Sequence, residues 1–329
     1  MSQDQAKPAP FRLAPVLRSI DPAIATAFAC IVALLLVGSL YSSNFLSADY
    51  LLQQIQVGSF LAMAATGMMI VVLLGQIDLS VPWVMTVGAM MSTAAAGWGP
   101  VGSWCAIPIG ILCGMLFGLV NGIGVAYLRV PSMIFTLGTN AVAQGLMIMR
   151  TGGAAPQDMA TAAMRTLATG RVVADIPNAL WIWMLIGVST VFLLRRTTFG
   201  RSVYAIGNSE RAAYLSGSRT RRITVLAFVM SGALSAFGGV LLAGYSTKAY
   251  QGMGDPYLLP AIAAVVLGGT SILGGRGTYL GTVAGVILIT LLQSILSIMQ
   301  IDESIRQIVY GLTIILMLLL YGRSAILRT

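Results

Sequence analysis

The stretch Pro22 to Tyr41 reads PAIATAFACIVALLLVGSLY and carries no charge. A helix of about 20 apolar residues crosses the roughly 30 Å hydrocarbon core of a bilayer. In lipid each segment must satisfy its own backbone hydrogen bonds, so we expect such runs to be helical. They recur along the chain and predict an all-α, polytopic membrane protein with about ten transmembrane helices. The predicted spans are approximately 23–41, 51–74, 79–97, 103–127, 132–150, 179–194, 223–245, 258–274, 278–298 and 304–321. The glycine-rich stretch at 258–274 is either a full span or a broken, partly re-entrant one.

The composition supports a single membrane domain. The chain has 329 residues, of which 57% are hydrophobic and 9% are charged, whereas a soluble domain carries roughly 25% charged residues. No polar block is long enough to form a second, soluble domain. We therefore expect a cytoplasmic segment at 1–22, a transmembrane domain at 23–321 and a cytoplasmic tail at 322–329.

The formal charge of +9 is unevenly distributed among the loops. When the N-terminus is placed in the cytoplasm and the spans alternate, most basic residues lie inside and most acidic residues outside, as the positive-inside rule requires. This pattern predicts two cytoplasmic termini, an external loop at about 151–177 and a cytoplasmic loop at about 195–222. The basic residues flank apolar spans without interleaved aromatics, which argues for contact with the lipid bilayer and against nucleic-acid binding.

The sequence lacks residues that several kinds of catalytic, metal-binding and nucleotide-binding sites require. There is no histidine, the commonest general base and zinc ligand, and Cys30, Cys105 and Cys113 lack metal-ligand spacing. GGTSILGGRGT (Gly268 to Thr278) has the glycines of a phosphate-binding loop but not its lysine. We therefore expect no catalytic residue, metal or cofactor, and a membrane-embedded enzyme is disfavoured.

Asp78, in LLGQIDLSVPW, is the one candidate carboxylate near membrane depth. Ion-driven carriers usually keep ionisable groups inside the bundle, so their scarcity weakens the alternative of an ion-coupled secondary carrier of a small neutral solute. Two roles remain open for Asp78. It caps a helix that begins near Leu79, or it belongs to a solute pathway or gate with its neighbours Gln76 and Ser80.

A second polar set lies on the predicted helix at 132–150. Thr136, Asn140 and Gln144 follow each other at i, i+4 and i+8, with Thr139 beside them, and so share one helix face. Neutral hydrogen-bonding groups of this kind suit the pathway of a neutral solute. They equally suit hydrogen bonds between helices of the bundle.

Two glycine ladders present bare helix faces that allow close approach. Packing within the subunit and a subunit interface both explain them. The ladders are Gly110, Gly114, Gly118 and Gly122, and Gly277, Gly281 and Gly285. The regions 74–96 and 267–289 are both glycine-rich breaks followed by a span, which hints at an internal repeat.

The loop at 195–222 contains SERAAYLSG, Ser209 to Gly217. Ser209 is a suitable N-cap and Gly217 a natural stop for a short amphipathic helix, in which Ala212, Ala213 and Leu215 supply helix-forming and apolar contacts. One interpretation is a basic loop that fixes topology and touches lipid headgroups. The other is a docking helix that seats in a cleft of another protein and transmits its motion.

Three stretches favour the docking helix. The chain resembles the permease subunits of bacterial ABC sugar importers of the ribose, xylose and galactofuranose type over roughly residues 50 to 320. Gln76 and Pro82 depart from the glycines common in that family. The stretches are LGQIDLSV (Leu74 to Val81), NGIGVAYLRVPSMIFTLGTNAVAQGL (Asn121 to Leu146), and FGRSVYAIGNSERAAYLSGSRTRRITVLAFVMSG (Phe199 to Gly232) with AIAAVVLGGTSILGGRGTYLGTVAG (Ala261 to Gly285).

The resemblance implies a transporter subunit of the bacterial inner membrane that hydrolyses no ATP itself. A separate ABC ATP-binding subunit would hold ATP and Mg and contact the coupling helix. A second permease, identical or paralogous, and a periplasmic sugar-binding protein complete the implied assembly, with a monosaccharide or related polyol as substrate. The implied coupling residues are Asn208, Ser209, Glu210, Arg211, Ala212, Ala213, Leu215, Ser216 and Gly217.

Overall fold

The computed structural model describes residues 22–42, 44–154 and 157–326, and within them every long element is an α-helix. This confirms the all-α prediction. The helices are α2 (Pro22–Tyr41), α3 (Ala48–Leu73), α4 (Val81–Ala96), α5 (Gly99–Ala126), α6 (Ser132–Thr151), α7 (Ala162–Thr169), α8 (Asn178–Arg196), α9 (Thr198–Asn208), α10 (Glu210–Leu215), α11 (Thr220–Ser246), α12 (Leu258–Leu267), α13 (Tyr279–Ile298) and α14 (Glu303–Ile326), with the 3-10 helix η1 (Asp255–Tyr257) before α12.

Six of the described helices, α3, α5, α6, α8, α11 and α13, are long and apolar enough to cross a membrane. The predicted span at 258–274 is not one continuous helix, which agrees with the alternative that it is broken. There α12 has only 10 residues, about 15 Å of helix and half of a hydrocarbon core. The apolar stretch of the sequence continues past Leu267, but the helix ends there. The residues that follow include four glycines with positive φ, a conformation that a helix does not contain: Gly269, Gly274, Gly275 and Gly277.

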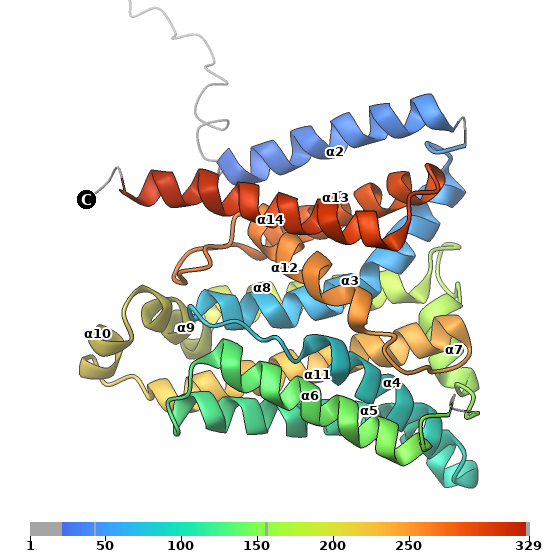
Figure 1. Ribbon diagram of the computed structural model, residues 1–329, viewed down its shortest axis with the longest axis horizontal. Helices are drawn as coiled ribbons and strands as arrows, with labels where there is room; N and C mark the ends of the chain where they lie inside the picture. The colour runs from blue at the N-terminus through green and yellow to red at the C-terminus, as the bar shows by residue number, and fades with distance from the viewer. Residues whose placement is uncertain (1–21, 43, 155–156, 327–329) are drawn as a thin grey trace, which may run out of the picture.

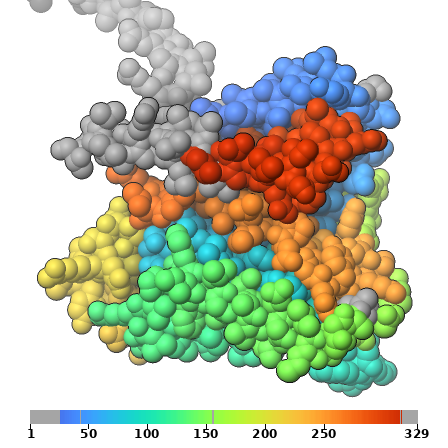
Figure 2. Space-filling view, in the orientation of Figure 1, coloured from blue at the N-terminus to red at the C-terminus, as the bar shows by residue number. Residues whose placement is uncertain are grey.

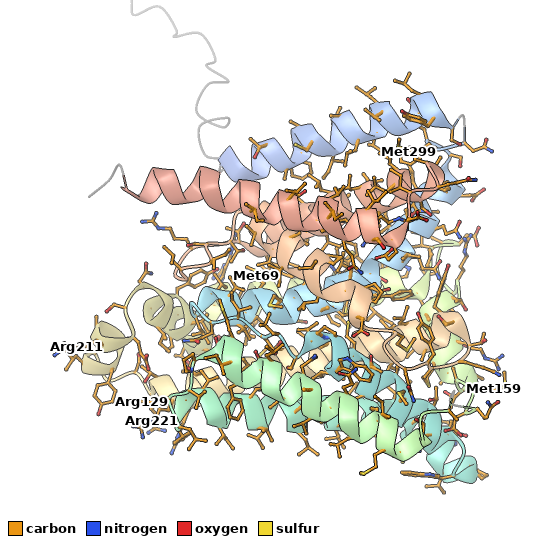
Figure 3. The ribbon with its side chains drawn as sticks, viewed as in Figure 1. Met69, Arg129, Met159, Arg211, Arg221 and Met299 are labelled. Carbon is orange, nitrogen blue, oxygen red and sulfur yellow. The ribbon has the colours of Figure 1, made fainter. Side chains whose placement is uncertain are left out.

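The helices lie roughly parallel, so the bundle has two ends (Figure 1). The first turn of α2 and the last turn of α14 lie at the same end as α9 and α10, whereas α7 lies at the opposite end. Arg129, Arg211 and Arg221 project from the α10 end (Figure 3). The topology prediction places these three arginines on one side, and they do lie at one end of the bundle; which side of the membrane that end faces stays a prediction. Lys7, Arg12, Arg18 and Arg328, which belong to the same prediction, lie outside the described residues.

The core of the bundle forms around α3, which is buried over most of its length, and α11, which packs against α3, α4 and α5. The first glycine ladder explains the close pair of α5 and α11. A Cβ on Gly118 would collide with the carbonyl of Phe228, and a Cβ on Gly232 with that of Gly114. Gly281 and Gly285 of α13 face α12 in the same way. Both ladders serve packing within this chain.

The two long loops contain helices that the sequence pattern did not reveal. The region 151–177 holds α7, which packs on α11 where Gly244 meets the carbonyl of Met164. The region 195–222 holds α9 as well as the expected α10. Both extra helices begin at a threonine N-cap, Thr161 and Thr197, whose side chain accepts a backbone hydrogen bond three residues on.

Candidate functional site

Helix α10 begins and ends where the sequence predicts. The Ser209 hydroxyl oxygen accepts a hydrogen bond from the Ala212 N–H at 3.3 Å, and Gly217, with φ +84°, follows the helix end. The hydroxyl of Ser216 donates to the Ala212 carbonyl at 2.9 Å. A helix this short depends on such caps, because isolated helices of one or two turns are unstable in water.

Most of α10 faces outward from the bundle. The α9–α10 segment projects at one end of the molecule (Figure 2). Within α10 only Ala213 is buried, whereas Tyr214 is 68% and Leu215 77% exposed. Leu215 therefore makes little apolar contact within its own chain. An exposed Tyr–Leu pair next to charged Glu210 and Arg211 forms a small apolar surface with a polar border, as protein interfaces do.

The base of this loop meets two irregular segments of the bundle at four glycines, Gly75, Gly207, Gly274 and Gly275, which we term the glycine junction. The Gly275 N–H donates to the carbonyl of Leu73 at 2.9 Å. A Cβ on Gly207, near the end of α9, would collide with both atoms of this bond. The other three glycines have positive φ, the conformation that favours glycine.

A buried polar network lies deeper in the bundle. Asp78 is 1% exposed. One of its carboxylate oxygens accepts from the Ser80 N–H at 3.0 Å and from the Ser80 hydroxyl at 2.6 Å. The other accepts from the Ser231 hydroxyl on α11 at 2.8 Å. The Asn121 amide of α5 donates to the Ser80 oxygen at 2.7 Å, and the Thr139 hydroxyl of α6 donates to the Asn121 oxygen.

The prediction that Asp78 caps α4 is wrong. The helix begins at Val81, its N-cap is Ser80, and no side chain caps it. Pro82 lies in the first turn and has no N–H for a cap to bind. Asp78 instead ties the segment before the helix to α11.

The polar face of α6 forms hydrogen bonds to the backbone of the segment before α4 and of the first turn of α4. The side-chain oxygens of Ser132, Thr136 and Asn140, spaced four residues apart, accept from the backbone N–H groups of Ile77 at 3.1 Å, Leu79 at 2.9 Å and Trp83 at 3.3 Å, respectively. These bonds satisfy backbone groups that have no partner in a helix.

These bonds support the interpretation that the polar face of α6 forms hydrogen bonds within the bundle. Gln144 is exposed and Gln76, like Asn140, is half-buried, but neither glutamine side chain makes a hydrogen bond within the described residues, so neither shares the role of the central members. Sequence reasoning missed Ser132, although it continues the spacing of four residues in the N-terminal direction.

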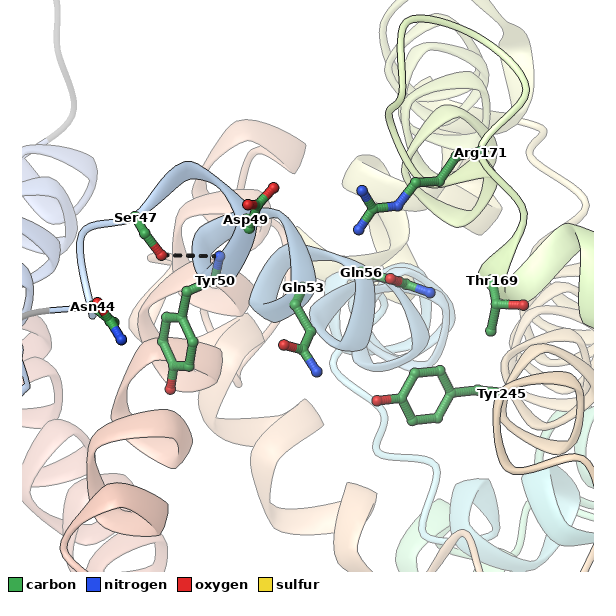
Figure 4. A pocket seen from close by; sticks show the side chains of 9 residues that line it. All are labelled: Asn44, Ser47, Asp49, Tyr50, Gln53, Gln56, Thr169, Arg171 and Tyr245. Atoms are coloured by element: carbon green, nitrogen blue, oxygen red, sulfur yellow. Dashed lines mark hydrogen bonds between the residues drawn. The ribbon is translucent and has the colours of Figure 1, made fainter.

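A cavity of about 530 Å³ opens at the end of the bundle opposite α10. Tyr50 and Gln53 of α3 and Tyr245 at the end of α11 line it together with Asp49 and Arg171 (Figure 4). The pathway candidates between Gln76 and Gln144 lie elsewhere. Gln53 and Gln56, polar residues near the start of the second predicted span that suit a pathway and interhelical hydrogen bonds equally, do line this cavity. Sequence reasoning singled out neither tyrosine, because each belongs to an apolar run and only the fold brings them together.

The sequence of this helical bundle matches a known family over residues 50–318, that of the branched-chain amino acid transport system / permease component. The chain belongs to this permease family. It is 33% identical over 297 residues to the ribose import permease protein RbsC of Haemophilus influenzae, covering 89% of this permease and 91% of that protein. It is also 33% identical over 303 residues to the autoinducer 2 import system permease protein LsrC of Yersinia pseudotuberculosis, covering 91% and 84%.

No solved structure matches the permease significantly. The matched region begins at the start of α3 and ends within α14, so it includes the polar network, the glycine junction and α10. The permease is therefore a transport component of the bacterial inner membrane. Its several apolar helices agree with that placement.

Proposed function

We propose that this permease is the transmembrane subunit of an ATP-driven ABC importer that carries a monosaccharide or related polyol into the cell. The observation that carries the proposal is α10, a capped helix that exposes Tyr214 and Leu215 at the basic end of the bundle. A lipid-contacting loop needs neither a defined helix nor an outward apolar pair. A docking helix needs a defined helical shape and an exposed apolar pair, because it must stay folded while its apolar side chains contact another protein.

The ATP-binding subunit would contact α10 and its flanks through Asn208 to Gly217, and it would bind ATP and Mg. A second permease, identical or paralogous, would complete the membrane-spanning unit. A periplasmic sugar-binding protein would dock at the opposite end, which carries α7 and the cavity. Amide and hydroxyl groups of Asn44, Gln53, Thr169 and Tyr245 line this cavity beside the charged Asp49 and Arg171, and its volume lies within the range of ligand pockets. Both neutral and charged hydrogen-bonding groups of this kind can bind the hydroxyls of a polyol.

The solute pathway itself stays a proposal. Thr136, Thr139, Asn140, Ser80 and Asp78 are engaged in hydrogen bonds within the bundle. The side chains of Gln76 and Gln144 make no hydrogen bond within the described residues and are the better candidates for contact with a passing solute. No observation favours the ion-coupled carrier, since the carboxylate of Asp78 already accepts three hydrogen bonds from the protein.

The test replaces Leu215 by Asp in complexes reconstituted with the cognate ATP-binding subunit and binding protein. A charge in an apolar contact costs desolvation energy, so we expect at least a tenfold loss of solute-stimulated ATPase activity and of uptake into proteoliposomes. Leu128→Asp is the matched control, because Leu128 is similarly exposed at 67% but lies in the turn between α5 and α6, outside α10 and away from the cavity. Full stimulation and normal assembly in Leu215→Asp would contradict the docking role.

The substrate class needs a separate measurement, because α10 carries no information about the solute. Thermal-shift assays on the companion binding protein, with a panel of pentoses, hexoses and polyols, should show stabilisation by at least one of them. Uptake of that solute by the reconstituted complex should require ATP and should not respond to a proton or sodium gradient.

A further inference from the structure

The segment between α3 and α4, residues 74–80, is held firmly at both of its ends. We term it the α3–α4 break. At one end Leu73, the last residue of α3, accepts a hydrogen bond through its carbonyl from the Gly275 N–H. At the other end Asp78 and Ser80 bond to Ser231 and Asn121. The break therefore connects the surface beneath the α9–α10 loop with the interior of the bundle.

The contact beneath the loop is backbone against backbone. Gly207 faces the Leu73 carbonyl and the Gly275 N–H so closely that neither leaves room for a Cβ. A Cβ on Gly274 would lie 2.7 Å from the Gly75 nitrogen and 3.0 Å from the Gly207 Cα. Flexible side chains can absorb a small shift by changing rotamer, but close-packed backbone cannot. A displacement of α9 must therefore displace the end of the break.

Two hydrogen bonds fasten α9 to the second irregular segment, which follows α12. The Tyr204 hydroxyl donates to the Gly277 carbonyl at 2.9 Å, and the Asn208 amide reaches the Gly275 carbonyl at 3.5 Å. Asn208 is also the last residue of α9, separated from α10 by Ser209 alone. The docking helix is thus joined to the junction by only a few residues, with no flexible linker between them.

The end of the break that lies farther from α9 is hydrogen-bonded to three helices. Asp78 bonds to α11, Ser80 bonds to α5, and the backbone of Ile77 and Leu79 bonds to α6. An extended chain spans at most about 3.6 Å per residue. The few residues from Leu73 to Asp78 therefore allow the two ends of the break to move only a short distance independently of each other. The bonds of Asp78 and Ser80 are buried and those of Ile77 and Leu79 are partly buried, and a hydrogen bond lost in a buried place is costly.

We propose that the α3–α4 break is the element that transmits movement of α9 and α10 to α5, α6 and α11, with the glycine junction as its point of attachment. Gly207 and Tyr204 are positioning residues of the transport cycle, because they act through the break and not on the solute. The inference rests on the proposed function of α10 as the contact of the ATP-binding subunit.

The experiment monitors the accessibility of the break through a single cysteine that replaces Gln76, which is half-buried. Cys30, Cys105 and Cys113 are first replaced by serine. The rate of maleimide labelling is measured in the reconstituted complex without nucleotide and after trapping with ATP and vanadate. We expect the labelling rate to change severalfold on trapping. Gly207→Ala should abolish most of that change while the ATP-binding subunit stays bound.

Gly145→Ala is the matched control, since it adds the same methyl group on α6 where nothing lies within 4 Å of the new atom. It should keep the parent response. If Gly207→Ala fails to assemble, Tyr204→Phe replaces it, because it removes one hydrogen bond without adding volume. Tyr204→Phe should at least halve the response.

Two results would overturn the inference. One is a labelling rate at position 76 that does not respond to trapping in the parent complex. The other is a full response in the assembled Gly207→Ala complex or in its Tyr204→Phe replacement. Failure of the proposed function would look different, because the parent complex would then lack ATP-dependent uptake altogether.

Discussion

Asp78 shows how much one residue depends on its surroundings. A buried carboxylate is tolerated only when its lone pairs are satisfied, and here three donors from Ser80 and Ser231 do so. No Lys or Arg forms an ion pair with it in the described part of the chain. Its role is to hold the α3–α4 break against α11.

Replacing Asp78 by Asn should lower stability, because an amide offers one acceptor oxygen where the carboxylate offers two. A hydrogen bond to a charged group contributes about 1.5–3 kcal/mol, so we expect a loss of about 2 kcal/mol. Thermal unfolding of the detergent-solubilised permease measures it. Ser231→Ala removes one donor alone and should lie between Asp78→Asn and the parent. Equal unfolding temperatures for all three proteins would show that the network contributes nothing.

At the scale of elements, the packing of α11 on α5 depends on paired glycines. Gly232 lies where a Cβ would collide with the Gly114 carbonyl, so the two backbones touch with no side chain between them. Local sequence predicted a bare helix face but not its partner. The structure identifies that partner as α11 of the same chain and not a second subunit.

The Gly232→Ala substitution should therefore push α11 away from α5. Overpacking of this kind typically costs about 1–3 kcal/mol, and we expect a lower unfolding temperature and a lower yield of folded protein. Gly138→Ala adds the same atom on α6 with nothing within 4 Å and should behave like the parent. Size-exclusion profiles after a temperature series compare the two variants. Matching profiles would refute the close contact.

Sequence periodicity identified the long helices more reliably than the short ones. Spans such as α5 and α13 carry enough apolar residues to be recognised from composition alone. Helices α7 and α9 were missed because each is short and lies in a polar stretch, where no long apolar run marks it. The span at 258–274 was overestimated because hydropathy does not register glycines that adopt positive φ.

At the scale of the whole molecule, the basic residues decide the proposed orientation. Arg129, Arg211 and Arg221 lie at the end that carries α10 (Figure 3), and the positive-inside rule places that end in the cytoplasm. The cavity opens at the opposite end. Solute would thus meet the permease on one side of the membrane and the ATP-binding subunit on the other.

Single cysteines test this orientation in a background without Cys30, Cys105 and Cys113. Tyr214→Cys on α10 should react with a membrane-impermeant maleimide only after the inner membrane is opened, whereas Val172→Cys should react in intact spheroplasts. The permease is expressed without its ATP-binding subunit, which would cover α10. Both parent residues are then well exposed, at 68% and 73%, so accessibility alone does not separate them. The reverse labelling pattern would place α10 outside and remove the basis of the docking proposal.

The order of residues is enough to predict an all-helical membrane protein with a capped helix in a basic loop. Those are local properties, because a run of apolar residues, an N-cap serine and a glycine stop each act within a few positions. The partners of Asp78 and the contacts among the glycines become visible only in the folded chain. Asp78 and Ser231 lie 153 positions apart, and the junction joins residues near 75, 207 and 275. Such contacts arise from the packing of the helices, which no local pattern specifies.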